Sequence, residues 1–246
     1  MPIVEHIVCP DANFSKEIVL IHGMTGSPDE LRPAAEIIAL SCHARVWLPR
    51  LKGHDTFAAL RTVRAQEWQQ QVLTVVERIR QESSRPLLLI GISFGALLSL
   101  YAAQMMPAHI AQLILLAPPW KIKGDLEDLQ LSVMSYLPEW LLDHTWTHKK
   151  ESLELALPRT CFSHHWIGAI ARLGKVRRVI YPHHISTPTL ILYDPYEHQV
   201  AEQGLKDLAL RMPNAKLVAV PDATHELLLG WHYQEVIKII TEFIRT

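Results

Sequence analysis

Short apolar runs alternate along the chain with longer segments in which apolar residues recur every three or four positions. The short runs are rich in Leu, Ile and Val, which is typical of parallel strands buried on both faces. This pattern predicts strands at residues 17–22, 44–49, 86–91, 112–118, 188–194 and 216–221. Residues 2–8 alternate between apolar and polar positions, and we expect them to form a leading edge strand.

Helical periodicity fills the intervals between these strands, and it predicts helices at residues 33–40, 65–83, 94–106, 202–212 and 233–245. Alternation of strands and helices indicates an α/β fold with a mostly parallel central sheet flanked by helices. The rhythm breaks between residues 120 and 184, where amphipathic helical patterns such as Leu126–His144, interrupted by Pro138, replace buried strands. We therefore expect a core of residues 1–119 and 185–246 with an inserted helical cap at 120–184; a run of ordinary outer helices is the alternative.

Composition narrows the class of protein. The 246 residues are 49% hydrophobic, and 24 basic residues balance 25 acidic ones, so a basic field for nucleic acid is not expected. No apolar run reaches the length of an integral membrane segment, and the first residues lack the pattern of a signal peptide. Three widely spaced cysteines do not form a disulfide framework and favour a reducing compartment. These features predict a cytoplasmic protein and leave open whether it is a monomer or a dimer.

A Gly-x-Ser-x-Gly sequence, Gly91 to Gly95, joins a predicted strand to a predicted helix. Glycines flank such a turn because its two limbs nearly touch and leave no room for a β-carbon. The turn exposes the Ser93 hydroxyl at the end of the strand, where the helix N-terminus favours negative charge. The motif alone is weak evidence, but its position between strand and helix makes Ser93 a candidate nucleophile.

A serine nucleophile needs a base, and the base needs an orienting acid. His225 follows the last predicted strand and is the candidate base among 14 histidines. The loop after the strand at residues 188–194 offers two acids, Asp194 and Glu197. Either carboxylate can reach His225 from the carboxyl end of the sheet, and the one that does not would stabilise the turn.

The tetrahedral intermediate of acyl transfer needs N–H donors. One candidate is the backbone N–H of Phe94, directly after the nucleophile. The other is the backbone N–H of Met24, in the glycine-containing loop "HGMTGSP" that follows an early strand.

Together, "LIHGMTGSPDELRP", "RLKGHDT", "LIGISFGA", "PTLILYDPYEHQV" and "PDATHE" resemble the successive blocks of the α/β-hydrolase superfamily, in its order Ser, acid, His. "HGMTGSP" and "LKGHD" are most similar to small carboxylesterases and monoacylglycerol lipases with a helical cap. The resemblance implies an eight-stranded sheet and a substrate that enters under the cap. Aligned on "PTLILY", the family's Gly-x-x-Asp places Glu197 at the acid position and Asp194 at the glycine, which favours Glu197. The resemblance also implies a structural role for His54.

The leading hypothesis is a serine ester hydrolase that forms an acyl-enzyme on a small-molecule ester with an apolar acyl group. Thioesterases, lysophospholipases, small peptidases and C–C bond hydrolases share the same triad, and a catalytically silent ligand-binding protein is the alternative from another class. Dehalogenases and epoxide hydrolases of this fold use Asp as nucleophile, which Ser93 disfavours. Adjacent histidine pairs, His164–His165 and His183–His184, lack the spacing of metal ligands, so we expect neither a metal nor another cofactor.

Overall fold

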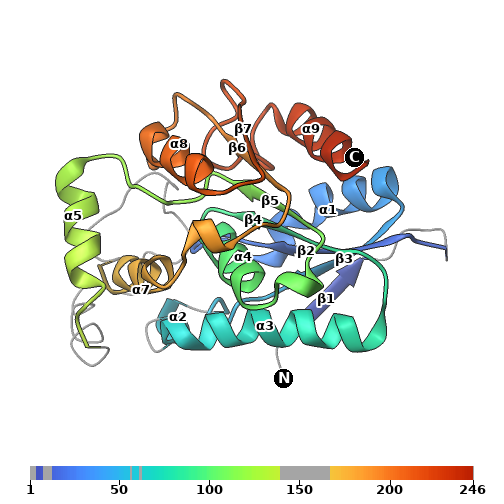
Figure 1. Cartoon of the computed structure of the whole chain (residues 1–246), viewed down its shortest axis with the longest axis horizontal. Coiled ribbons are helices and arrows are strands. Elements are labelled where there is room, and N and C mark those ends of the chain that lie inside the picture. The colour runs from blue at the N-terminus through green and yellow to red at the C-terminus, as the bar shows by residue number, and fades with distance from the viewer. Residues whose placement is uncertain (1–3, 8–12, 56, 61–62, 139–166, 246) are drawn as a thin grey trace.

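The computed structural model describes residues 4–7, 13–55, 57–60, 63–138 and 167–245, and within them the strands form one seven-stranded sheet. The order across the sheet is β1-β3-β2-β4-β5-β6-β7 (Figure 1). Strand β1 runs antiparallel to β3, and all other neighbours are parallel. The strands are β1 Val4–Ile7, β2 Lys16–Ile21, β3 Ala44–Pro49, β4 Leu87–Ile92, β5 Gln112–Leu116, β6 Thr189–Tyr193 and β7 Ala215–Ala219.

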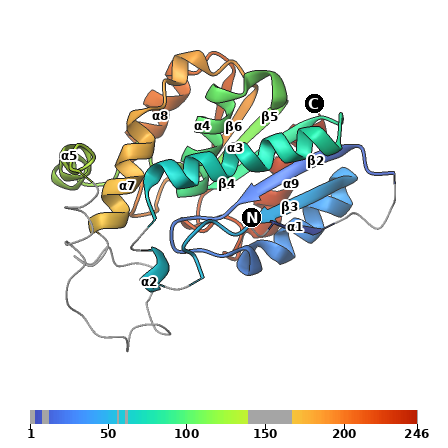
Figure 2. The same cartoon turned by 90° about the horizontal axis from the view of Figure 1, so that it is seen from below.

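Helices cover both faces of the sheet. α1 and α9 pack side by side on one face, whereas α3 and α4 lie on the other (Figures 1 and 2). The α-helices are α1 Pro28–Cys42, α2 Phe57–Leu60, α3 Ala65–Glu82, α4 Phe94–Met105, α5 Asp125–Met134, α7 Ile167–Arg178, α8 Glu202–Arg211 and α9 Tyr233–Arg245. This three-layer arrangement confirms the α/β fold with a mostly parallel central sheet.

The apolar runs build two cores because successive strand residues point to opposite faces. In β2, Ile18 and Leu20 pack with α1 and α9, while Val19 and Ile21 pack with α3 and α4. All six residues of β4 are buried, as expected for a central strand covered on both faces. The sheet is thus a rigid platform whose parallel strands end at one common edge.

Some boundaries differ from the predictions. The helix predicted at 33–40 begins at Pro28, because Pro is favoured at the first helical positions and Pro33 lies inside the helix. The resemblance implied eight strands, and the described residues contain seven.

Only parts of the predicted cap are described. α5 ends at Met134, before Pro138, and α7 packs against α5, α3 and α4 at one end of the molecule (Figure 2). Residues 139–166, which include most of the predicted cap and His164–His165, lie outside the described residues. Among the helices that are described, none is both long and apolar enough to cross a membrane.

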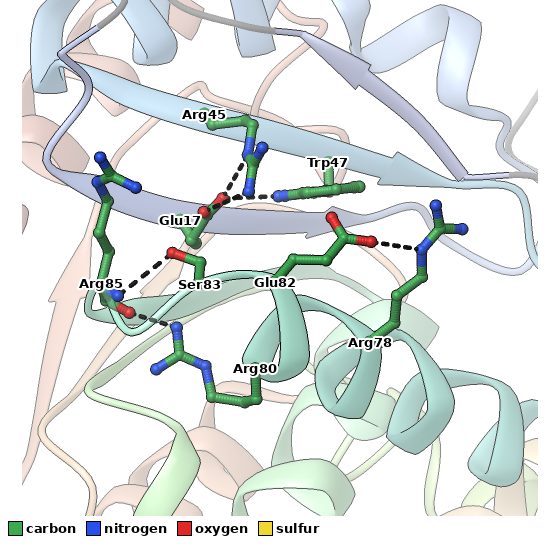
Figure 3. A network of polar contacts seen from close by, with 8 residues as sticks. All are labelled: Glu17, Arg45, Trp47, Arg78, Arg80, Glu82, Ser83 and Arg85. Atoms are coloured by element: carbon green, nitrogen blue, oxygen red, sulfur yellow. Dashed lines mark hydrogen bonds and ion pairs between the residues drawn. The ribbon is translucent and has the colours of Figure 1, made fainter.

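A buried carboxylate ties β2 to β3 at the amino end of the sheet (Figure 3). Glu17 is fully buried, and its two oxygens accept hydrogen bonds from Arg45 Nη2 at 2.6 Å and Arg45 Nε at 2.9 Å. The Trp47 indole N–H also donates to Glu17, at 2.8 Å. Because a buried charge without partners is costly in free energy, these hydrogen bonds stabilise Glu17 within the sheet.

We predict that Glu17→Ala lowers the free energy of unfolding by about 2–4 kcal/mol, because Arg45 and Trp47 lose a shared acceptor. Urea denaturation measures the change. Glu36→Ala, at an exposed position of α1, is the control and should change stability by less than about 0.5 kcal/mol. Equal effects of the two substitutions would contradict a structural role for the Glu17 network.

Candidate active site

The turn from β4 to α4 holds Ser93 in a strained backbone conformation. Ser93 has φ 50° and ψ −115°, a region that L-residues rarely adopt. A β-carbon on Gly91 would lie 2.3 Å from the Gly95 carbonyl oxygen, and one on Gly95 would lie 2.2 Å from the Ile21 carbonyl oxygen. Both glycines are therefore required by backbone contacts, and the Gly-x-Ser-x-Gly motif forms the sharp strand-to-helix turn that its spacing predicts.

The loop after β2 lies directly against this serine. A β-carbon built on Gly23 would lie 3.6 Å from the Ser93 β-carbon, and the Ser93 N–H donates to the Leu116 carbonyl at 2.8 Å. Ser93 itself is only half-buried. Three strand ends, those of β2, β4 and β5, thus converge on a serine that solvent can reach.

The two candidate oxyanion donors belong to residues close to Ser93: Phe94 follows it in the chain, and Met24 lies in the loop that contacts it. Phe94 is the first residue of α4, where the N–H has no acceptor within the helix, and its side chain is fully buried. Met24 follows Gly23 in the loop beside Ser93. Within the described part of the chain, neither backbone N–H donates a hydrogen bond to another protein group. Both amides are available to a ligand.

The loop after β6 buries the Glu197 carboxylate close to His225. Glu197 Oε2 lies 3.4 Å from His225 Nδ1, and the two side chains are 3% and 9% exposed. The separation is longer than a well-formed hydrogen bond, and His225 Nδ1 has no hydrogen-bond partner among the described residues. Glu197 also accepts hydrogen bonds from the N–H groups of Gln199 at 2.7 Å and Val200 at 2.5 Å. These two donors hold the carboxylate in place.

Asp194 occupies a different place in the same loop. Its Oδ2 accepts the Thr224 N–H at 2.9 Å, and its Oδ1 accepts the Tyr196 N–H at 2.9 Å. Thr224 precedes His225 and has a positive φ of 63°. Asp194 therefore holds the backbone of the His225 loop, whereas Glu197 approaches the imidazole itself.

The structure brings the predicted site residues to one edge of the sheet without closing every contact. Ser93, Glu197 and His225 follow β4, β6 and β7, whose carboxyl ends share that edge. Within the described residues, which include both Ser93 and His225, no hydrogen bond joins the Ser93 hydroxyl to the imidazole. Catalytic hydrogen bonds are often long in the absence of substrate.

A buried histidine, His22, and a half-buried one, His54, support the loop beside Ser93. The Nε2 atom of His54 lies 2.9 Å from the Met24 carbonyl oxygen, and this contact ties the loop to the one after β3. His22 lies at the end of β2, and burial lowers its pKa to about 3. The sequence reasoning expected a structural role for His54 and assigned none to His22, although both lie in the motifs it singled out.

A further contact that the sequence did not predict joins the acid loop to the first residues of the predicted cap. The Lys123 ammonium donates to the Glu197 carbonyl at 2.9 Å, and the Lys123 N–H donates to the Gln199 carbonyl at 2.9 Å. Ile122 pairs with Val200 in an antiparallel bridge. These contacts are non-local in sequence, so no local motif reveals them.

A cavity of about 350 Å³ lies beside the described part of the predicted cap, and Ser93 does not line it. Five of the eight lining residues are charged. Two of these five form an ion pair, in which Arg177 Nη1 lies 2.7 Å from Asp128 Oδ1. The lining consists of Trp120, Lys121, Asp128, Arg177, Arg178, Ile180, Gly204 and Asp207. This charged cavity differs from the apolar acyl pocket that the substrate hypothesis requires.

In the described ranges, no group of three or more His, Cys, Asp or Glu side chains is placed to hold a metal ion. His183 and His184 pack against each other with ring centroids 4.2 Å apart, and Tyr181 packs against both. This pair is therefore part of an aromatic cluster after α7.

Comparisons with known proteins agree with the fold. The model of the "Alpha/beta hydrolase family" matches residues 18–239. A thermostable monoacylglycerol lipase from Bacillus sp. (strain H-257) is 34% identical over 91 residues. That match spans 37% of this chain and only 36% of the relative's length.

Solved structures match nearly the whole chain. One structure comes from the work on LipS and LipT, two metagenome-derived lipolytic enzymes, and has a TM-score of 0.76 at 21% sequence identity. This match covers 98% of the present chain and 96% of the matched chain. A soluble variant of monoglyceride lipase from Saccharomyces cerevisiae has a TM-score of 0.74 at 11% sequence identity. This match covers 98% of the present chain and 90% of the yeast chain. At these identities the structural matches establish the fold alone.

We predict that Gly95→Ala lowers the free energy of unfolding by at least about 3 kcal/mol, although Gly→Ala in a helix normally stabilises it. The added methyl group would meet backbone oxygens of β2 that cannot move aside. Gly23→Ala is the control, since its β-carbon would have no neighbour nearer than 3.6 Å. Thermal and urea unfolding measure both variants, and a Gly95→Ala protein as stable as the control would disprove the crowded turn.

Proposed function

Because the chain belongs to the alpha/beta hydrolase family, we propose that it is a serine ester hydrolase in which Ser93, His225 and Glu197 form the catalytic triad. One observation carries this proposal: Ser93 is strained and solvent-accessible, and the neighbouring Phe94 and Met24 have backbone N–H groups that no other protein group uses within the described residues. Strain of this kind persists only where the surrounding structure enforces it, and it is concentrated at functional sites.

In the proposed mechanism, Ser93 Oγ attacks the ester carbonyl carbon while His225 Nε2 accepts the hydroxyl proton. The carbonyl oxygen becomes an oxyanion that the N–H groups of Met24 and Phe94 stabilise. His225 then donates the proton to the alcohol oxygen as the C–O bond breaks, which leaves an acyl-enzyme on Ser93. Water, deprotonated by His225, attacks this acyl group; the bond from the acyl carbon to Ser93 Oγ then breaks as His225 returns the proton to Oγ, and the carboxylic acid is released.

Glu197 is the proposed acid of the triad. Its carboxylate is the one that approaches His225 Nδ1, at 3.4 Å, and two backbone N–H groups hold it in place. A negative charge at this position stabilises the imidazolium that forms during attack. Asp194 has both oxygens engaged by backbone N–H groups and is proposed to position the loop that carries His225.

The proposed substrate is a small ester with an apolar acyl group, of the monoacylglycerol type. The partial relative from Bacillus is a monoacylglycerol lipase, which supports this class. Residues 120–184 are proposed as a cap that covers the acyl chain, and α5 and α7 are its described parts. The same triad chemistry hydrolyses thioesters, lysophospholipids and other acyl compounds, so a panel of substrates is needed to separate these activities.

We predict that a fluorophosphonate probe labels the wild-type protein and that Ser93→Ala abolishes labelling, because the probe phosphonylates an activated serine. Ester hydrolysis should fall by more than about 10⁴-fold in the same variant. Ser99→Ala is the control, since Ser99 is buried in α4 with its hydroxyl bonded to the Gly95 carbonyl. Failure of the folded wild-type protein to label would favour a catalytically silent ligand-binding protein.

We also predict that Glu197→Gln lowers kcat by about 10³–10⁴-fold, because a neutral amide no longer stabilises the imidazolium. Asp194→Asn removes a charge from the same loop and should lower kcat less than about 10-fold while it reduces thermal stability. Kinetics on p-nitrophenyl esters of increasing acyl length compare the two. A larger loss of kcat in Asp194→Asn would make Asp194 the acid.

A further inference from the structure

His22 is a fully bonded, buried histidine at the end of β2, next to the loop that carries Met24. Its Nε2 lies 3.1 Å from the backbone nitrogen of Leu51, and its Nδ1 lies 2.8 Å from the Gly23 carbonyl oxygen. The side chain is 1% exposed. The proposed mechanism does not use this residue, yet both of its ring nitrogens are engaged.

The two contacts determine which nitrogen carries the proton. A backbone N–H can only donate, so Leu51 requires an unprotonated His22 Nε2. The neutral ring then has its proton on Nδ1, which donates to the Gly23 carbonyl. Burial, together with the neighbouring His54, lowers the pKa of His22 to about 3, so the ring remains neutral at ordinary pH.

The Gly23 carbonyl belongs to the same peptide unit as the Met24 N–H. A peptide unit is planar and trans, so a carbonyl held in one direction fixes the N–H in the opposite direction. The Gly26 N–H donates to this carbonyl as well, at 3.2 Å. Hydrogen bonds accepted by a carbonyl also polarise the amide and strengthen its N–H as a donor.

We propose that His22 is a positioning residue of the oxyanion hole, which aims and polarises the Met24 N–H through the Gly23 carbonyl. The inference rests on the proposed hydrolase function and deepens it. Leu51, in the loop after β3, is part of the same device because its N–H sets the tautomer of His22.

His54 restrains the next peptide unit. Its Nε2 contacts the Met24 carbonyl at 2.9 Å, and its ring meets the His22 ring edge-on with centroids 4.7 Å apart. Rings continue from His54 to Trp68 at 6.1 Å and from Trp68 to Phe94 at 5.0 Å. The peptide units on both sides of Met24 are thus held by imidazoles, and a packed row of rings connects them to the residue after Ser93.

Two substitutions separate the two contacts of His22. The amide nitrogen of Asn reaches the position of Nδ1, so His22→Asn keeps a donor for the Gly23 carbonyl and loses the acceptor for Leu51. The amide of Gln reaches the position of Nε2, so His22→Gln keeps the Leu51 contact and loses the donor to Gly23. His109→Gln, at an exposed position, is the control for a histidine substitution.

We expect His22→Gln to lower kcat on a p-nitrophenyl ester by about 10²-fold with little change in KM, the loss typical of one misplaced oxyanion donor. A boronic acid, which forms a tetrahedral adduct with the serine, should lose affinity by the same factor. His22→Asn should retain kcat within about 10-fold, whereas both variants lose thermal stability. The control should match the wild type.

Equal losses of kcat in the two variants, or unchanged boronic acid affinity in His22→Gln, would overturn the proposal. If either variant fails to fold, two-bond ¹H–¹⁵N spectra of the wild-type imidazoles decide, and a proton on Nε2 of His22 would overturn it. Labelling of wild type by the fluorophosphonate probe tests the hydrolase function separately. If the probe labels the wild-type protein and the two His22 variants lose kcat equally, only the role of His22 is refuted.

Discussion

The site depends on one close approach of backbone to backbone, where the first turn of α4 packs on the end of β2. A β-carbon at Gly95 would lie 2.2 Å from the Ile21 carbonyl oxygen and 2.7 Å from that of His22. This contact brings the loop after β2, which carries Met24, against Ser93. The strained conformation of Ser93 is maintained because a core packs each face of the sheet, and α4 is part of one of these cores.

Sequence reasoning succeeded where the determinants are local. The strands could be predicted because apolar runs buried on both faces leave a continuous pattern, and β4 is such a run. The turn at Ser93 could be predicted because only glycine fits at residues 91 and 95. The start of α1 was misplaced because Pro28 and Pro33 are both compatible with a first helical turn, and local pattern does not choose between them.

Residue type and spacing left both Asp194 and Glu197 open, and only the family resemblance favoured Glu197, because the contacts that distinguish the two carboxylates are non-local. Asp194 bonds to the N–H of Thr224, thirty positions further along the chain, and Glu197 approaches His225 from the same loop. His22 was missed for the same reason, since its tautomer depends on Leu51 in another loop. Residues recognisable by type acquire their function from partners that no local pattern specifies.

The loop after β6 also links the proposed triad to the first residues of the predicted cap. Lys123 donates to the carbonyl of Glu197, and Ile122 pairs with Val200, whose N–H binds the Glu197 carboxylate. The backbone that fixes the acid is therefore the backbone that anchors the entry to the cap. Displacement of this entry segment would shift the two N–H donors of Glu197 together, because Lys123 also binds the Gln199 carbonyl. In the proposed enzyme, the pairing of Ile122 with Val200 would therefore connect the start of the cap to the loop that carries Glu197.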